Sequence, residues 1–229
     1  AARNSGIKKS TSTLVAFLDG DMAVKEDWLE SYLSFFNKNI VAVMGDNIPP
    51  KDAILNPIEK YYFSKDRGAR QFSSGSKISF QYMLYGNAMI KRKVLIECGM
   101  FDEKINKYGG EDTDLSIRIW GKYPNQFVYS KKSSSTHFQR RTLEEFCNQM
   151  KAYGENNFLL LSERYPDYSA ELGTDLINSF KGILIFNPII KTIIKLIYLI
   201  FPFQIVIRYM VIDSVICGAR SSSKIKTDK

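Results

Sequence analysis

The stretch TLVAFLDGDM, residues 13–22, decides the fold of this 229-residue chain. Its first six residues form a continuous apolar run, which predicts a strand buried on both faces, as in a parallel sheet covered by helices. Asp19 and Asp21 follow the strand, and Gly20 between them lets the backbone turn sharply. This end of a strand is where α/β folds bind ligands. The two carboxylates therefore indicate either an ordinary Asp-Gly turn or oxygen ligands for Mg²⁺ or Mn²⁺.

The segments around this stretch alternate between strand and helix patterns. Residues 25–38 carry aromatic and leucine side chains at helical spacing, and residues 40–44 form a second short apolar run. Strand, helix and strand in this order predict an α/β sheet. Farther along, the sequence predicts a helix near 58–63, a strand, turn and strand over 78–90, helices over 93–98, 111–121 and 142–161, and a strand over 126–129.

A second group of acids opens the predicted helix in GGEDTDLSIRIW, residues 109–120. Acids in a first helical turn complement the helix dipole, which accounts for Asp114. Glu111 and Asp112 are adjacent, and neighbouring like charges raise each other's pKa. A carboxylate held in this way is a candidate general base.

The single histidine, His137, is predicted to lie in a loop after a strand, close to Arg140 and Arg141. A lone histidine is more often structural than a ligand. As a ligand, a neutral imidazole favours Mn²⁺ over Mg²⁺. The two arginines are candidates for clamping a diphosphate.

Four segments together resemble the ordered motifs of family-2 glycosyltransferases: ARNSG at 2–6, FLDGDM at 17–22, YGNAMIKRKVLIECGMFDE at 85–103 and GGEDTDLSIR at 109–118. The resemblance covers about residues 1–145. It implies an α/β fold of the GT-A type, a Rossmann-like mixed sheet flanked by helices. It also implies inverting transfer of a sugar from a nucleotide sugar, expected to be a UDP-sugar, with Mn²⁺ or Mg²⁺ as cofactor.

The resemblance also implies roles for particular residues. Asp21 is expected to bind the metal directly, with Asp19 nearer the ribose and His137 as a further ligand. Asp112 matches the family's base, with Glu111 beside it as a second catalytic candidate. The residues expected to bind substrate are Arg3, Asn4, Gly86, Asn87, Gly110, Arg140 and Arg141.

Two departures from the family pattern add expectations. The opening strand of the form V-S-V-I-I-P and the acid that grips the nucleobase are not found before ARNSG, so the chain is expected to lack its N-terminal nucleotide-binding segment. The Q-x-x-R-W motif of processive synthases is reduced to Gln139 and Arg140 without the tryptophan. Transfer of a single sugar is therefore expected.

From about residue 182 the sequence becomes strongly apolar but is interrupted by charges, and no charge-free run reaches the roughly 18 residues of a spanning helix. Lys191, Thr192, Lys195 and Tyr198 form a narrow polar stripe, which is typical of a helix lying in a membrane interface. The lysines of this stripe are expected among lipid headgroups, and the basic tail residues Lys224, Lys226 and Lys229 are expected to add attraction to anionic lipid. A helical pair packed on the core and a spanning hairpin hinged at Pro202 are the alternatives.

The domain organisation predicted from these patterns is a catalytic region over 1–165, a linker over 166–181 and membrane-associated helices with a basic tail over 182–229. The expected location is the cytoplasmic face of the cell membrane, with peripheral or monotopic attachment. The expected acceptor is a glycan or a lipid-linked molecule, in cell-surface polysaccharide or glycolipid synthesis.

Composition limits the other possibilities. The net charge of +8 predicts an acidic partner. No helix-turn-helix, zinc-finger or RNP-like pattern is present, so nucleic acid is not expected. Three widely spaced cysteines favour a reducing compartment. Two rival functions remain. One is a metal-dependent nucleotidyl- or phosphotransferase, although no P-loop is found, and the other is a non-catalytic membrane-associated binding module.

Overall fold

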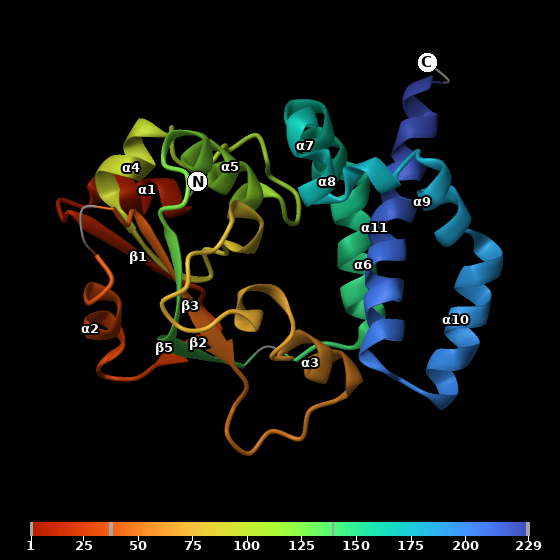
Figure 1. Ribbon diagram of the computed structural model, residues 1–229, viewed down its shortest axis with the longest axis horizontal. Helices are drawn as coiled ribbons and strands as arrows, with labels where there is room; N and C mark the ends of the chain where they lie inside the picture. The colour runs from red at the N-terminus through yellow and green to blue at the C-terminus, as the bar shows by residue number, and fades with distance from the viewer. Residues whose placement is uncertain (1, 37–38, 139, 228–229) are drawn as a thin grey trace. The chain divides into compact units, whose positions relative to one another are not determined.

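The computed structural model describes residues 2–36, 39–138 and 140–227, and the burial of side chains as far as residue 223. The chain forms two compact units (Figure 1). The first consists of Ala1–Ile54, Phe63–Lys104 and Glu111–Gln139, and the second of Leu55–Tyr62, Ile105–Gly110 and Arg140–Lys229. The helix expected over 142–161 belongs to the second unit, and so do residues 166–181.

A five-stranded mixed sheet in the order β1-β4-β3-β5-β2 forms the centre of the first unit. Its strands are β1 (Leu14–Leu18), β2 (Met22–Val24), β3 (Ala42–Ile48), β4 (Asn87–Lys91) and β5 (Phe127–His137). Strands β3 and β5 run parallel, whereas the other neighbouring pairs are antiparallel. Six of the seven residues of β3 are buried, because this strand lies in the middle of the sheet. The fold is therefore mixed α/β, as the sequence predicts.

Strand β1 forms where the apolar run predicts it, but its surroundings differ from the expectation. It lies at the edge of the described sheet and pairs only with β4, in the antiparallel sense. Of its five residues only Phe17 is buried. The prediction of burial on both faces in a parallel sheet is wrong, because the β-forming residues of this run suit an edge strand equally well.

Helices of the first unit lie around the sheet. They are α1 (Ala2–Lys9), α2 (Trp28–Leu33), α4 (Arg92–Glu97) and α5 (Glu111–Lys122). Helix α2 packs Trp28 and Tyr32 against Val43, Met89 and Val128 of the sheet. In Figure 1, helices α1, α4 and α5 lie together at the end of the unit away from α2.

The segment 78–90 contains one strand rather than the two expected. A 3₁₀ turn at Phe80–Tyr82 replaces the first of them, and only β4 follows. Phe80 packs edge-on against Trp120 of α5, with 6.1 Å between ring centroids. The aromatic residues that indicated a strand are used here to pack a turn on a helix.

The second unit is helical. Its helices are α3 (Pro57–Tyr62), α6 (Leu143–Tyr153), α7 (Leu159–Arg164), α8 (Ser169–Leu172), α9 (Phe180–Ile185), α10 (Pro188–Ile200) and α11 (Gln204–Thr227). Thr142 and Glu145 form a capping box at the start of α6, which satisfies two backbone donors. One buried cluster joins three of these helices: Ile58 and Tyr61 of α3, Leu143 and Phe146 of α6, and Ile207 and Val211 of α11.

Helix α6 continues through a π-helical turn at Gly154–Phe158 into α7. A side chain at Gly154 would overlap the carbonyl oxygen of Val215, and one at Gly218 would overlap that of Lys151. These two glycines therefore allow α11 to approach α6 and the π-helical turn backbone to backbone.

Two residues of the polar stripe of α10, Lys191 and Tyr198, face the neighbouring helices, whereas Thr192 and Lys195 are exposed. Lys191 forms an ion pair of 2.7 Å with Asp213 of α11, and Tyr198 packs against the cluster of α3, α6 and α11. The expectation that the lysines of the stripe lie among headgroups is wrong for Lys191, because a buried acid on the neighbouring helix binds it. No described helix is both long and apolar enough to span a membrane. The tail side chains Lys224, Lys226 and Lys229 lie outside the described side chains.

Candidate active site

Arg3 lies at the centre of a group of carboxylates in the first unit. Helix α1 carries it to Asp19 at the end of β1, where its Nη2 donates to Oδ1 at 3.0 Å. Its Nη1 donates to Oδ1 of Asp112 at 3.0 Å and lies 3.6 Å from Oε1 of Glu111. The guanidinium carbon stands 5.3 Å from the centre of the Phe101 ring. One cation thus joins the D-x-D turn to the acids that begin α5.

Asp112 is the most strongly perturbed carboxyl of this group. Burial raises its pKa to about 6, with further increases from the charges of Glu111 and Asp19 and an opposing decrease from Arg3. Its Oδ2 accepts a hydrogen bond from the backbone N–H of Tyr85 at 3.0 Å, which fixes the orientation of the carboxylate. At neutral pH it is ionised and is a stronger base than an ordinary aspartate.

Glu111 lies beside Asp112 with a polar atom to spare. Its Oε2 is buried and has no hydrogen-bond partner among the described residues. A buried acceptor without a donor is costly, so this atom is suited to a hydroxyl group of a substrate. Asp114, in contrast, is fully buried and forms an ion pair with Arg118 one turn further along α5, at 2.6 Å.

Asp21 and His137 form a second, separate contact. Nε2 of His137 lies 3.2 Å from Oδ2 of Asp21. His137 is the last residue of β5, where it pairs with Met22 in β2, so the prediction that it lies in a loop is wrong. The pairing of β2 with β5 brings the imidazole to the D-x-D turn. The Asp21 side chain is 39% exposed, which leaves it open to a ligand.

These two residues fit a divalent metal only in part. No group of three or more His, Cys, Asp or Glu side chains within the described ranges is arranged to hold an ion. One carboxylate and one imidazole are a donor set for Mn²⁺ that needs substrate phosphate oxygens and water to complete it. Asp19 is instead bound to Arg3.

Gly86 is required by the position of Asp19. A Cβ atom at residue 86 would lie 2.6 Å from Oδ2 of Asp19. The backbone N–H of Asp19 also donates to the carbonyl of Gly86 at 2.9 Å. The residue therefore shapes the site by leaving room for a carboxylate.

The side chain of Asn87 is buried and forms all of its hydrogen bonds within the fold. Its Oδ1 accepts from Trp28 Nε1 at 3.0 Å and Tyr32 Oη at 2.6 Å, and its Nδ2 donates to the carbonyls of Asp46 and Ser133, both at 2.9 Å. These four bonds use every donor and acceptor of the amide. The side chain of Asn87 thus ties α2 to three strands, and the predicted role of Asn87 in substrate binding stays a prediction.

Asn4 also has a structural role. Its Nδ2 donates to the carbonyl of Phe101 at 2.8 Å and to Glu103 at 2.9 Å, and its Oδ1 accepts from the N–H of Phe101 at 3.0 Å. The prediction that Asn4 binds substrate stays a prediction. Asn4 fixes α1 to the loop after α4 and so positions Arg3.

Gly110, Arg140 and Arg141 belong to the second unit. Arg140 forms two hydrogen bonds with Glu59, at 2.9 and 3.0 Å, and Arg141 donates to Gln149 at 3.1 Å and stands over Phe146. A Cβ at Gly110 would lie 3.0 Å from Cβ of Asn157. Their predicted roles in substrate binding stay predictions. Gln139 lies outside the described residues.

One ion pair of the sheet, between Asp46 and Arg70, is not evident from the sequence. Asp46 of β3 is buried, and its Oδ1 lies 3.0 Å from Nε of Arg70. Burial raises the pKa of Asp46, and the charge of Arg70 opposes the increase. The basic run KDRGARQ was the available signal, but it did not indicate which acid would meet it.

The mixed sheet, with a D-x-D turn after its edge strand β1 and an acid pair at the start of α5, has the arrangement of a glycosyltransferase fold of the GT-A type. The chain belongs to the family described as glycosyltransferase like family 2, which matches residues 1–168.

Curated relatives share modest identity with the chain. A pre-mycofactocin glycosyltransferase of Mycobacterium tuberculosis is 29% identical over 175 residues, which are 75% of this chain and 36% of that protein. A chondroitin synthase of Pasteurella multocida is 26% identical over 152 residues, covering 53% of this chain and 16% of the synthase. The chain thus spans about a third or less of the length of these two relatives.

Among solved structures, a mannosyltransferase of Pyrobaculum calidifontis, in complex with GDP-Man and Mn²⁺, matches with a TM-score of 0.53 and 13% identity. The match covers 95% of this chain and 64% of the mannosyltransferase. At this identity the likeness supports the fold.

Proposed function

We propose that this chain transfers a sugar from a nucleoside-diphosphate sugar to an acceptor hydroxyl group, with inversion at the anomeric carbon. The observation that carries the proposal is the partly buried Asp112, whose side chain is 18% exposed, whose pKa is raised to about 6 and whose carboxylate is held by Arg3 and by the backbone of Tyr85. The chain belongs to a glycosyltransferase family, and transfer of a sugar to a hydroxyl group needs a general base.

In the proposed reaction, Asp112 takes the proton of the acceptor hydroxyl as its oxygen attacks the anomeric carbon. The bond from that carbon to the phosphate oxygen breaks on the opposite face, and the nucleoside diphosphate leaves with the bonding electrons. Glu111, through its unpartnered Oε2, accepts a hydrogen bond from a substrate hydroxyl. Arg3 keeps Asp112 ionised at neutral pH by offsetting the charges of Glu111 and Asp19.

Asp21 and His137 are the residues that would hold a divalent cation in this proposal, with Mn²⁺ favoured by the imidazole. When bound there, such an ion would neutralise charge on the leaving diphosphate. Asp19 has a different part, since Arg3 binds its Oδ1 and its backbone is bonded to Gly86. It orients Arg3, and its proposed partner in the donor is a ribose hydroxyl group.

The donor and the acceptor belong to the proposal as classes of molecule. A UDP-sugar is the first donor to test, and GDP-mannose is the second because it is bound in the Pyrobaculum neighbour. We propose a glycan or lipid-linked acceptor and transfer of one sugar at a time, in cell-surface polysaccharide or glycolipid synthesis.

The test is the rate of nucleoside-diphosphate release by the full chain, with donor sugars offered together with glycan and lipid-linked acceptors. Asp112→Asn is expected to lose about 10²–10⁴ in turnover with donor affinity unchanged, as is usual for a general base. Asp66→Asn, at an exposed acid of the same unit, is the matched control and is expected to keep the wild-type rate.

Three results would contradict the proposal. Normal turnover by Asp112→Asn with weakened donor binding would make Asp112 a binding residue. A larger loss from Glu111→Gln than from Asp112→Asn would move the base to Glu111. Release of pyrophosphate from nucleoside triphosphates, without release of diphosphate from sugar donors, would favour a nucleotidyltransferase.

A further inference from the structure

The second unit exposes a concentrated apolar surface. Of the 21 large hydrophobic side chains exposed among the described residues, 12 lie between residues 180 and 205. They are Phe180, Ile183, Leu184, Ile189, Ile193, Leu196, Ile197, Leu199, Ile200, Phe201, Phe203 and Ile205. Single exposed hydrophobic residues are ordinary, whereas a group of this size marks a surface that contacts another apolar phase. We call these twelve residues the apolar face.

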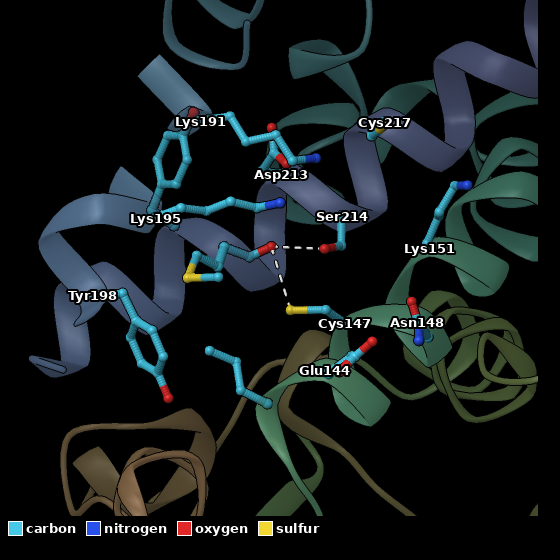
Figure 2. Close-up of a pocket in the computed structure, with 13 residues that line it drawn as sticks. Glu144, Cys147, Asn148, Lys151, Lys191, Lys195, Tyr198, Asp213, Ser214 and Cys217 are labelled. Atoms are coloured by element: carbon cyan, nitrogen blue, oxygen red, sulfur yellow. Dashed lines mark hydrogen bonds and ion pairs between the residues drawn. The ribbon is translucent and has the colours of Figure 1, made fainter. Parts of the chain in front are cut away.

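The apolar face follows from the way α10 packs. Helix α11 lies between α6 and α10 in the second unit (Figure 1). The inner side of α10 presents Lys191, Lys195 and Tyr198 to a pocket that α6 and α11 also line (Figure 2). Its outer side consists of isoleucine and leucine, and Ile189 and Leu199 are 74% and 78% exposed. The usual arrangement of a surface helix is therefore reversed, with polar residues inside and apolar residues outside.

The net charge of the residues around the apolar face indicates which kind of partner covers it. From residue 180 to the end, the chain holds eight lysines and arginines and two aspartates. One of these acids, Asp213, is buried and bound to Lys191. Lys181, Lys195 and Arg208 are exposed on the same helices. A second copy of the chain would bring like charges together, whereas an anionic lipid leaflet is complementary to both the apolar and the cationic groups.

A pocket beside the face offers a place for part of one lipid chain. It has a volume of about 280 Å³ and apolar walls that include Phe186, Ile194 and Ile205. Arg208 also lines it, and its guanidinium can pair with a lipid phosphate. Helix α10 has 13 residues, a length of about 20 Å, compared with about 30 Å for the hydrocarbon core of a bilayer. The helix can lie in the membrane interface but is too short to cross the hydrocarbon core.

We propose that the chain docks on an anionic membrane leaflet through the apolar face, with α9 and α10 lying in the plane of the interface. The cytoplasmic leaflet carries the required negative surface potential. Lys181 and Arg208 contact headgroups, while Lys191 stays bound to Asp213. Docking does not depend on the proposed reaction, because none of these residues belongs to the acid site of the first unit.

The test is co-sedimentation of the full chain with vesicles of phosphatidylcholine alone or mixed with phosphatidylglycerol. Wild type is expected to bind the mixed vesicles, less so as salt rises. The double variant Leu196→Glu/Leu199→Glu is expected to bind at least about a hundredfold more weakly, since each buried leucine contributes roughly tenfold. The matched control is Leu29→Glu/Leu33→Glu in α2, where the leucines are 51% and 52% exposed. It is expected to bind like wild type.

A second variant keeps the proposal testable if the leucine variant unfolds. Lys181→Glu/Arg208→Glu is expected to lose the preference for phosphatidylglycerol while the thermal transition is retained. Equal binding of wild type to both kinds of vesicle would overturn the role of charge. Unchanged binding by the leucine variant would overturn the role of the face. Wild type that ignores vesicles but forms a dimer, with the leucine variant monomeric, would show that a second copy covers the face.

Discussion

Arg3 offers a direct test of the electrostatics proposed for the acid site. Its Nη1 lies 3.0 Å from Asp112, whose pKa it lowers toward about 6 against burial and two neighbouring acids. Arg3→Gln removes this opposing charge. A cation at such a distance lowers the pKa of an aspartate by about one to three units. The pKa of Asp112 is therefore expected to rise to about 8 in the variant, taking about two units as the middle of that range.

The size of the effect on the reaction follows from this shift. A base with a pKa near 6 is about 90% ionised at pH 7, whereas one with a pKa near 8 is about 10% ionised. Arg3→Gln is expected to lose about ninefold in kcat/KM at pH 7 and to recover most of it near pH 9. The acid limb of the profile moves upward because the neutral form of Asp112 persists to higher pH.

The assay is kcat/KM for donor turnover between pH 5 and pH 9.5. Arg3→Lys keeps a cation and is expected to hold the acid limb closer to the wild-type position. Lys8→Gln, at an exposed lysine of the same helix, is the matched control and is expected to leave the profile unchanged. An acid limb that stays near pH 6 in Arg3→Gln would refute the reasoning. An equal loss at every pH would make Arg3 a substrate-binding residue.

Three further predictions concern the same unit. Asp112→Asn is expected to raise the free energy of unfolding at pH 7 by up to about 3 kcal/mol, and by little at pH 4. The reason is that the pKa of Asp112 is about 6 in the folded chain against an ordinary value of 3.8, so ionisation of Asp112 destabilises the fold at pH 7 but not at pH 4. Thermal transitions at both pH values check this, and an equal gain at pH 4 and pH 7 would contradict it. Gly86→Ala is expected to displace the Asp19 carboxylate and lower turnover more than tenfold. The control is Gly6→Ala, where a Cβ meets nothing within 4 Å, and its turnover is expected to stay unchanged. Equal rates in both variants would show that the contact between a Cβ at residue 86 and Asp19 is harmless. Asp21→Ala is expected to abolish metal-dependent transfer with the thermal transition unchanged, and wild-type rates at saturating Mn²⁺ would refute the assignment of Asp21 as a ligand.

Local signals in the sequence were sufficient for most elements of the first unit. The apolar run before Asp19 places β1, and the acids after Gly110 place the start of α5, because each depends on residues near it in the chain. The parallel or antiparallel sense of β1 was not accessible in the same way. It depends on β4, about 70 residues away, and the composition of an edge strand does not reveal its partner.

The roles of Arg3 and Asn87 illustrate the same limit at the level of side chains. The sequence named both as candidates for substrate binding. It did not reveal that Arg3 joins acids 16 and 109 positions away, or that the side chain of Asn87 forms all its hydrogen bonds within the fold. Helical spacing likewise identified the polar stripe of α10 but not the direction it faces. That direction depends on Asp213 in a different helix, and a single periodic pattern carries no information about it.

The course of the chain between the two units limits how the protein can be divided. Residues 55–62 and 105–110 lie between segments of the first unit in the sequence but fold with the second. Ile58 and Tyr61 share their cluster with Leu143 and Phe146 of α6, and Asn157 donates to the carbonyls of Lys107 and Gly109. Cutting the chain after residue 139 would therefore strip two internal segments of their packing partners. Because segments of the two units alternate along the chain, no single cut separates them, and the two units are expected to require expression as one chain.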